Sequence, residues 1–327
     1  MDAGTIYTDE AQKWIEARLR RLYRQAQAEI IQKLDAHTKQ LYALDAIKRA
    51  QVESGKLSKE AYTQWLNFQV FRGKQWKNKL DSVATTLLTA NQQANDIIEG
   101  KKLSVFGENA FFQSYKLEHD LDMNLSFGIY DSATVARLIK EQPELLPRKT
   151  INAIRDLAWN RQKISNCIVQ GIIQGESIRQ IAERIAKQTS STNMDAMIRY
   201  ARTAMTGAQN AGRIEMLHEA QKMGIDVKKK WLATLDGRTR DAHRELDGQI
   251  QEVGDPFESE LGDIMYPGDF RAHPANVYNC RCTLVYVYPK YTPQDAQRRA
   301  YNDPDSSESE LIGDMTYQQW LAWKRSR

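Results

Sequence analysis

The segment HPANVYNCRC, residues 273–282, carries one His and two Cys, although the chain of 327 residues holds only five His and three Cys. Thiolates and imidazoles are the groups with which proteins hold zinc, usually four of them in a tetrahedron. If CRCTLVYVY forms a strand, Cys280 and Cys282 lie on the same face, because side chains alternate along a strand. His243 and His273 could then complete a structural zinc site.

The same two Cys have a simpler explanation as small core residues, since free Cys is among the most buried residue types. The spacing C-x-C is also tighter than the usual zinc knuckle. A Cys/His nucleophile is disfavoured, because two Cys on one strand face give no reason for a lowered thiol pKa. A disulfide between Cys280 and Cys282 would be strained. We therefore favour a core strand fixed by polar contacts, with zinc as the alternative.

The segment LDGRTRDAHRELDG could also carry chemistry. Asp236 and the Gly after it predict a turn, and the residues that follow predict a short helix ending at Gly248. Arg240, His243 and Asp247 would share one face of that helix, where the carboxylate could orient the imidazole. An ordinary surface pair, or a polar network that holds the following loop, explains the same residues and is preferred.

A metal-dependent nuclease or toxin-like enzyme is the alternative function. It would be centred on His243, Asp247, His273, Cys280 and Cys282. The HNH nuclease motif needs a hairpin followed by a helix, whereas here a strand and a tail follow the second Cys. The sequence also contains no phosphate-binding loop, dinucleotide fingerprint, HExxH or GxSxG motif. We therefore expect a protein that is not an enzyme and has no certain cofactor.

Two basic clusters are candidates for contacting DNA, although the net charge of +4 and the pI near 8.8 are mild. The first, RGKQWKNK, interleaves aromatic and basic residues, a mixture that can bind nucleic acid. The candidate residues are Arg72, Lys74, Lys77, Lys79, Lys228, Lys229 and Lys230. An amphipathic helix with a solvated basic face explains the first cluster equally well and is preferred.

Long helices are predicted for the first part of the chain. Apolar residues recur at helical spacing over residues 8–53, and Ser58 is placed to cap a second helix that runs to about residue 99, before Gly100, with Gly73 as a dividing point. Helices of this length are far above the usual ~12 residues. They indicate an extended arm or bundle, a shape typical of assembly proteins.

The second half of the chain changes character. Helices are expected at about 148–172, 177–188 and 194–223, with QTSSTN as a polar linker before the last of them. KKKWLATL and CRCTLVYVY then alternate like strands. The predicted fold class is α+β: a long helical N-terminal region followed by a small α+β core with a short mixed or antiparallel sheet.

Targeting signals and disulfides are not expected. The N-terminus has no basic start followed by an apolar stretch, and no apolar run approaches the ~20 residues that span a bilayer. Three Cys is an odd, small number for a disulfide framework. These features favour synthesis in a reducing cytoplasm and no membrane partner.

Read in order, ARTAMTGAQNAGR, KKWLATLDGRTRDAHRELDGQ, YPGD and HPANVYNCRC resemble the phage Mu F-like (SPP1 gp7-like) head morphogenesis, or minor capsid, family. The resemblance covers about residues 195–290, and the ordered set is specific although each piece alone is weak. Many family members carry an acid where this chain has Ala204. The resemblance implies a structural polar network made of Arg202, Thr203, Asn210, Asp236, Arg238, Arg240, His243, Asp247 and Asn279.

The resemblance also implies a function and a division of the chain. It implies a minor head protein of a tailed phage that acts in procapsid assembly at the portal vertex. The portal protein is the expected partner, with scaffolding protein, major capsid protein and non-specific double-stranded DNA as further candidates and an influence on DNA ejection as a hypothesis. The expected location is the virion, after assembly in the host cytoplasm. The expected regions are a helical arm (1–147), a helical connector (148–193), the Mu F-like domain (194–290) and an acidic linker with a short helix (291–327).

Overall fold

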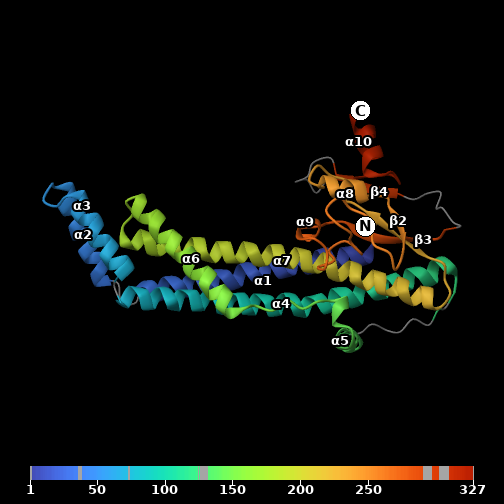
Figure 1. Cartoon of the computed structure of the whole chain (residues 1–327), viewed down its shortest axis with the longest axis horizontal. Coiled ribbons are helices and arrows are strands. Elements are labelled where there is room, and N and C mark those ends of the chain that lie inside the picture. Colours follow the sequence, from blue (N-terminus) through green and yellow to red (C-terminus); the bar gives the residue numbers. More distant parts are fainter. Residues whose placement is uncertain are drawn as a thin grey trace. The chain divides into compact units, whose positions relative to one another are not determined.

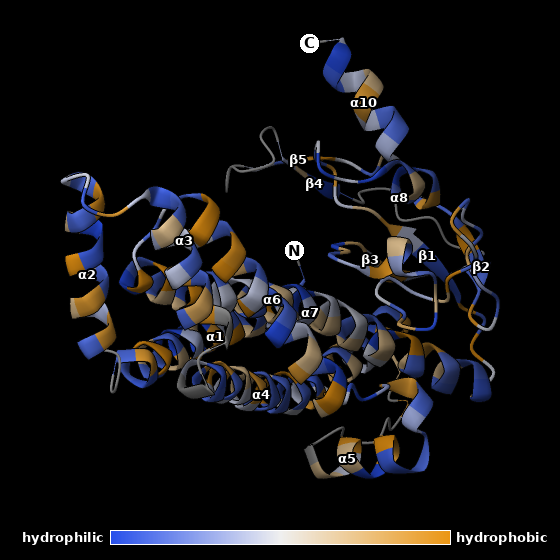
Figure 2. Cartoon of the chain, turned by 60° about the vertical axis from the view of Figure 1, so that its left-hand side comes forward, coloured by the Kyte–Doolittle hydropathy of each residue, from blue (hydrophilic) through white to orange (hydrophobic). Residues whose placement is uncertain are grey.

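The computed structural model describes residues 2–35, 39–72, 74–123, 125, 132–289, 297–301 and 309–326. Long helices are followed by small antiparallel sheets, which confirms the predicted α+β class (Figure 1). Hydrophobic and hydrophilic residues alternate along these helices (Figure 2). No helix within the described ranges combines the length and apolar character that crossing a bilayer requires.

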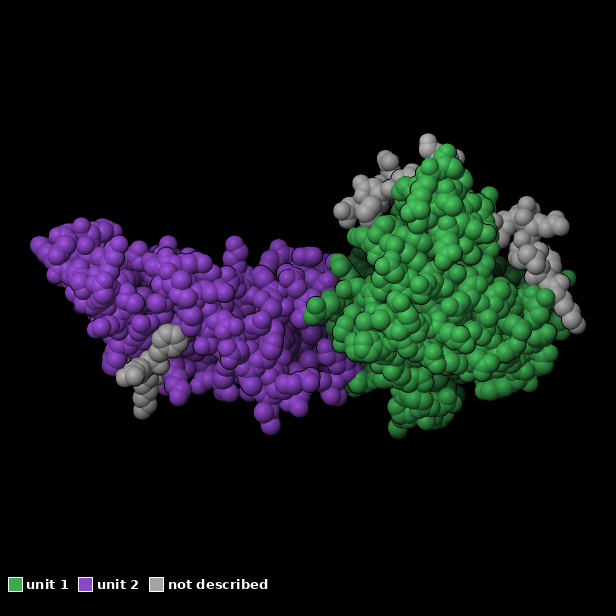
Figure 3. Space-filling view, turned by 45° about the horizontal axis from the view of Figure 1, so that its top comes forward, with its two compact units in different colours: residues 1–14, 98–148, 199–327 green, residues 15–97, 149–198 purple. Residues whose placement is uncertain are grey.

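The chain divides into two compact units (Figure 3). Unit 1 comprises residues 1–14, 98–148 and 199–327, and unit 2 comprises residues 15–97 and 149–198. Three helices contribute residues to both: α1 (Ala3–Asp35), α4 (Lys74–Leu121) and α7 (Ile178–Lys222). The four regions expected from the sequence stay a prediction.

Unit 2 is helical. Besides its parts of α1, α4 and α7, it contains α2 (Lys39–Glu53), α3 (Lys59–Asn67), the π-helix η1 (Phe68–Arg72) and α6 (Ala153–Ile173). The predicted cap of α3 is confirmed, since the Ser58 side chain accepts a hydrogen bond from the Ala61 amide at 3.1 Å. Of the single helix expected over residues 8–53, the structure describes α1 and α2. Residues 36–38 between them lie outside the described ranges, as does Gly73.

The prediction of a polar linker at QTSSTN is wrong, because α7 runs through it. Two of the polar residues there, Thr189 and Asn193, are buried and hydrogen-bonded. Asn193 donates to Asn160 of α6 at 3.0 Å and accepts from Asn91 of α4 at 2.7 Å, while Thr189 bonds the Ile185 carbonyl at 2.7 Å. Buried polar side chains with partners can stay in a helix, so composition alone misled the prediction.

In unit 1, the prediction that a helix ends before Gly100 is wrong, because α4 continues past Gly100 to Leu121. Gly costs a helix interior about 1 kcal/mol, and tertiary contacts of the next turn offset it. Lys102 is buried, donates to the carbonyl of Pro147 at 2.7 Å and pairs with Glu99 at 3.0 Å. The helix α5 (Ser132–Glu141) and the short 3₁₀ helix η2 (Pro143–Leu145) follow.

The first sheet of unit 1 has the order β2-β1-β3 and is antiparallel throughout. Its strands are β1 (Lys228–Leu232), β2 (Ile250–Glu252) and β3 (Thr283–Val287). Burial alternates along β1 and β3, and Trp231 and Leu284, which face each other in the register, are both fully buried. The sequence therefore predicted the two main strands, although β3 begins at Thr283 and not at Cys280.

A second, two-stranded antiparallel sheet is formed by β4 (Gln297–Tyr301) and β5 (Ser309–Gly313). The helix α10 (Tyr317–Arg325) follows and begins with a capping box between Thr316 and Gln319. This sheet and α10 share a small core of Leu235, Ala300, Ile312, Tyr317 and Trp320. The short helix expected at the end of the chain is thus present.

Within unit 1, α7 passes close to α4 at Gly212. A Cβ atom there would lie 2.3 Å from the backbone oxygen of Phe106. We expect Gly212→Ala to lower the free energy of unfolding by about 1–3 kcal/mol, as overpacking does. The control is Gly100→Ala in α4, which has no atom within 4 Å of its added Cβ and should raise stability by about 0.5–1 kcal/mol. Urea unfolding measures both, and a Gly212→Ala protein as stable as the parent would contradict the close approach.

Candidate functional site

His243, Cys280 and Cys282 form a buried cluster in unit 1. His243 lies on α8 (Asp241–Leu246), and the two Cys lie just before β3. The Nδ1 atom of His243 is 3.4 Å from Sγ of Cys282 and 3.8 Å from Sγ of Cys280. All three ligand atoms lie within 4.8 Å of one another. The cluster thus joins three of the four residues considered for zinc.

The orientation of His243 is fixed by a backbone contact. Its Nε2 atom lies 2.9 Å from the carbonyl oxygen of Asn276, in the short helix α9 (Pro274–Val277). A carbonyl can only accept, so Nε2 carries the hydrogen and donates it. In the neutral imidazole, Nδ1 therefore turns its lone pair toward the two sulfur atoms. Trp231 packs edge-on against the ring, with the centroids 5.5 Å apart.

The pKa values of the two thiols are shifted in opposite directions. Burial opposes ionisation of Cys280, but the hydrogen bond from Cys282 and the charges of Arg240 and Arg281 lower the pKa of Cys280 below its ordinary value. Burial and the neighbouring Cys280 raise the pKa of Cys282 well above that value. Without a metal, Cys282 would therefore hold its proton more firmly than Cys280.

His273 is not part of the cluster. Its side chain is exposed, and Nδ1 accepts a hydrogen bond from the Ala275 amide at 3.3 Å, capping the start of α9. His273 thus orders the helix whose Asn276 carbonyl holds His243. A four-ligand site that includes His273 does not fit this geometry.

The expected pairing of His243 with Asp247 is absent, because α8 ends at Leu246 and Asp247 has extended backbone. Asp247 instead receives both guanidinium arms of Arg298 from β4, at 2.8 and 2.9 Å. It also accepts from the amides of Ala233 and Tyr317, each at 2.6 Å. Asp247 therefore joins three segments of unit 1. Arg298, outside the matching motifs, was missed because its partner is distant in sequence.

Asp236 organises the turn before α8. Its Oδ1 atom accepts from the amide of Thr239 at 3.0 Å and from Nη2 of Arg281 at 2.8 Å. The backbone amide of Arg238 also donates to Oδ1 at 3.0 Å, but its side chain is largely exposed and its Nε atom lies 3.9 Å from the carboxylate. The residue between the two Cys, Arg281, is thus the main partner of Asp236, which the sequence did not indicate.

Burial opposes ionisation of Asp236, but the hydrogen bonds and charge of Arg281 lower the pKa of this carboxyl below its ordinary value. A lowered folded-state pKa adds stability above the unfolded-state pKa of about 3.9. That stability is lost as pH falls through the lower folded-state value. We expect Asp236→Asn to lower the free energy of unfolding by about 2 kcal/mol at pH 7. On acidification from neutral pH, the free energy of unfolding of this variant should fall less than that of the parent. Urea unfolding across that range tests this.

The matched control is Asp241→Asn on the neighbouring helix, where the carboxylate is 83% exposed and pairs with Arg244. Exposed pairs contribute little, about 0–1 kcal/mol. Its pH profile should follow the parent. Identical profiles for Asp236→Asn and the parent would show that Asp236 adds no pH-dependent stability.

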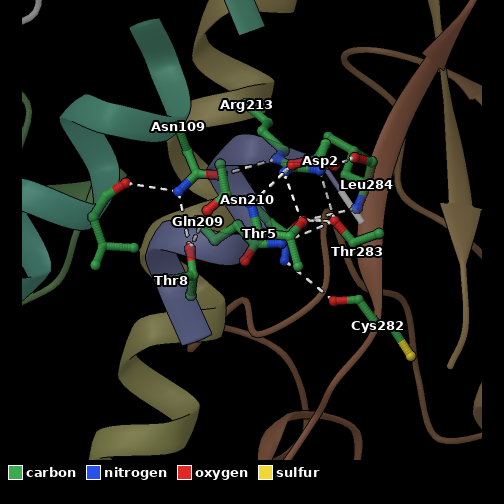
Figure 4. A network of polar contacts seen from close by, with 12 residues as sticks. Asp2, Thr5, Thr8, Asn109, Gln209, Asn210, Arg213, Cys282, Thr283 and Leu284 are labelled. Atoms are coloured by element: carbon green, nitrogen blue, oxygen red, sulfur yellow. Dashed lines mark hydrogen bonds and ion pairs between the residues drawn. The ribbon is translucent and has the colours of Figure 1, made fainter. Parts of the chain in front are cut away.

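Asn210 and Arg213 of α7 form the other half of the polar network (Figure 4). Asn210 donates to the Pro267 carbonyl at 3.0 Å and accepts from the Leu284 amide at 2.8 Å, so it holds the loop and β3 together. Arg213 is buried and directs its guanidinium to Asp2 at 2.6 Å and to Thr283 at 2.8 Å. Arg213 stands inside the matching motif, but nothing local indicated its partners.

The remaining motif residues have smaller parts. Thr203 accepts from the Asn279 amide at 3.2 Å, where Asn279 has a positive φ of 54°. Arg240 donates to the backbone carbonyls of Ala275 and Tyr278. Arg202 is exposed on α7, and Ala204 is fully buried. An acidic side chain at position 204 would be buried and would need a partner. The structure gives no reason for an acid at this position.

The basic residues considered for DNA contact are mostly engaged elsewhere. Lys229 is buried and donates to the Met265 carbonyl at 2.9 Å, which removes it from any DNA surface, and burial lowers its pKa to about 8. Lys228 pairs with Glu252, and Lys230 pairs with Asp314. Lys79 bonds the carbonyl of Leu34 at 3.4 Å, while Lys77 is exposed. The side chains of Arg72 and Lys74 lie outside the described residues.

The chain is similar to one protein family and to several known proteins. A family model described as "Phage Mu protein F like protein" matches residues 162–285. The minor head protein GP7 of Bacillus phage SPP1 is 28% identical over 252 residues, covering 75% of this chain and 76% of that protein. No solved structure matches the chain.

Two bacterial proteins are similar over part of their length. The NAD(+)–arginine ADP-ribosyltransferase EFV of Enterococcus faecalis is 27% identical over 244 residues, covering 74% of this chain and 48% of the relative. An uncharacterized protein of Haemophilus influenzae is 26% identical over 239 residues, covering 68% of this chain and 49% of the relative. The chain therefore spans about half the length of these two relatives.

Residues 162–285 are thus similar to the Mu F-like family, and most of the chain is similar to the SPP1 minor head protein. The resemblance predicted from the ordered motifs is confirmed.

Proposed function

We propose that this protein is a minor head protein that enters the procapsid of a tailed phage at the portal vertex and is carried in the virion. The observation that supports this most strongly is the similarity to the SPP1 minor head protein over about three quarters of both chains. The portal protein is the proposed direct partner, in the host cytoplasm where procapsids form. Scaffolding protein and major capsid protein are the alternative partners.

Unit 2 offers a surface on which a partner could bind. Trp159, Val169 and Ile173 lie on one face of α6, and Val169 and Ile173 are 42% and 79% exposed. Exposed apolar side chains that share a face are suited to burial against another protein. We propose that this face of α6 contributes to binding the head.

Deleting residues 1–100 would not test this cleanly. Asp2 and Thr5 bond Arg213, and Thr8 bonds Asn109, so the deletion would remove core partners of unit 1. Substitution on the surface of α6 leaves these contacts in place.

The test is capture of the portal protein of the same phage by the tagged full-length protein, together with incorporation into procapsids. We expect capture by the parent and at least a tenfold loss in Val169→Glu/Ile173→Glu, roughly the 1.4 kcal/mol that a tenfold change represents. The control is Phe111→Glu in unit 1, whose side chain is 55% exposed. Absence of the parent protein from procapsids would refute the proposal, and capture of a different head component would refute the portal part.

We propose a structural rather than an enzymatic role. The buried His243 and the two Cys offer no surface to a substrate, Asp247 is bound to Arg298, and His273 is occupied at α9. The ADP-ribosyltransferase relative carries that activity in a chain of which this one spans 48%. Incubation with DNA or RNA plus divalent metal should leave the nucleic acid intact. Cleavage that is lost in His243→Ala would overturn the structural role.

A further inference from the structure

The His243–Cys280–Cys282 cluster is not explained by a role in head assembly. Throughout the described ranges, it is the one group of three or more His, Cys, Asp or Glu side chains whose ligand atoms come close enough to share a metal ion. All three residues are buried. Two thiols and an imidazole occupy core volume that Val or Leu side chains would fill more favourably. The arrangement therefore calls for a chemical reason.

The distances match zinc coordination. With Zn–S near 2.3 Å and Zn–N near 2.05 Å, a tetrahedral centre sets the S···N separation at about 3.6 Å. The two observed Nδ1···Sγ separations, 3.4 and 3.8 Å, lie on either side of that value. The two Nδ1···Sγ separations are therefore compatible with one shared ion, and all three ligand atoms lie within 4.8 Å of one another.

The imidazole is also presented as a ligand. Metal-binding His residues usually donate their other ring N–H to a carbonyl or carboxylate, which fixes the tautomer. Here Nε2–H donates to the Asn276 carbonyl at 2.9 Å and leaves the Nδ1 lone pair facing both sulfur atoms. The sequence separations of 37 and 39 residues between His243 and the two Cys show that the fold, not local spacing, creates this arrangement.

We propose that His243 Nδ1 and the thiolates of Cys280 and Cys282 bind one Zn²⁺ ion in unit 1. Two thiolates and an imidazole select zinc over hard cations such as Mg²⁺ or Ca²⁺. Binding releases the thiol protons to solvent, because the thiolate is the ligand. Among the described residues, no fourth His, Cys, Asp or Glu joins the group.

The ion has a structural role. It joins α8 to the segment that runs from α9 into β3, and it leaves the exposed His273 outside the ligand set. Metal binding to a site that exists only in the folded chain adds directly to folding stability. This site is independent of the partner proposed for α6 and would exist whether or not the protein binds a portal.

The test measures zinc in the full-length protein purified under reducing conditions, and then replaces it with Co²⁺. We expect one zinc per chain and the intense near-ultraviolet thiolate-to-cobalt bands of a tetrahedral site. Cys280→Ser, Cys282→Ser and His243→Ala should each lose most of the metal. Cys167→Ser, which removes the third buried Cys from α6, should retain it, and so should His273→Ala.

Because the Ser variants could unfold for other reasons, the parent protein provides a second measurement. Removing zinc with a chelator should lower its melting temperature, and adding Zn²⁺ back should restore it. Folded parent protein that takes up neither zinc nor cobalt under reducing conditions would overturn the proposal. Loss of the metal in Cys167→Ser or His273→Ala would overturn this ligand set, and an unchanged melting temperature after zinc removal would overturn the structural role.

Discussion

Arg298→Met is expected to lower the free energy of unfolding by about 3–5 kcal/mol, the cost of removing one partner from a buried ion pair. The Arg298 and Asp247 side chains are 7% and 0% exposed. Arg298 also donates to the carbonyls of Ala233 and Met315, each at 2.7 Å. The Met side chain fills the space but leaves a buried carboxylate and two carbonyls without their donors. Urea unfolding followed by tryptophan fluorescence measures the loss.

The neighbouring position on β4 gives a matched control. Arg299 is exposed and bonds Ser309 at 2.7 Å, so Arg299→Met should change stability by less than about 0.5 kcal/mol. Asp247→Asn/Arg298→Met should lose less than the sum of its single variants, because the two charges act on each other. If the free energies of unfolding of Arg298→Met and Arg299→Met are equal, the ion pair does not hold β4 against the rest of unit 1.

The strands could be predicted because their signal is local. Alternation in CRCTLVYVY placed Cys280, Cys282 and Leu284 on one face, and all three are buried. The turn at Asp236 was also predicted. The helix expected to close at Gly248 ends two residues earlier, at Leu246, and Gly248 adopts a φ of 86° that L side chains rarely take. Such features depend on a few adjacent residues, which a sequence displays directly.

The helix boundaries were less predictable, because distant contacts decide them. Gly100 and the polar residues of QTSSTN are breakers by composition, yet α4 and α7 run through both. Lys102 reaches the Pro147 carbonyl, and Asn193 reaches Asn91 and Asn160. These partners are 45, 102 and 33 residues away, so no local pattern could reveal them.

The candidate site shows the same division. The sequence named His243, Cys280 and Cys282, and the structure brings them together. It also named His273 as a ligand and Asp247 as the partner of His243, and the structure gives both residues other partners. Residue type identified the chemistry, whereas the end of α8 at Leu246 determined which groups meet.

Arg213→Met is the second substitution with a large expected effect. The five N–H donors of the Arg213 guanidinium bond Asn109, Thr283, Leu284, Asp2 and Thr5. These acceptors come from the N-terminal segment, α4 and β3, so one side chain links three segments of unit 1 (Figure 4). We expect a loss of about 3–5 kcal/mol, because buried acceptors and the Asp2 carboxylate are left without their donor.

Hydrogen exchange can locate this loss. Amides of residues 3–14 and of β3 should exchange faster in Arg213→Met, since both segments lose their link to α7. The control is Lys222→Met on the same helix, whose side chain is 68% exposed and pairs with Glu219. It should leave exchange at both segments unchanged. Normal protection of both segments in Arg213→Met would mean that apolar packing alone holds the N-terminal residues in unit 1.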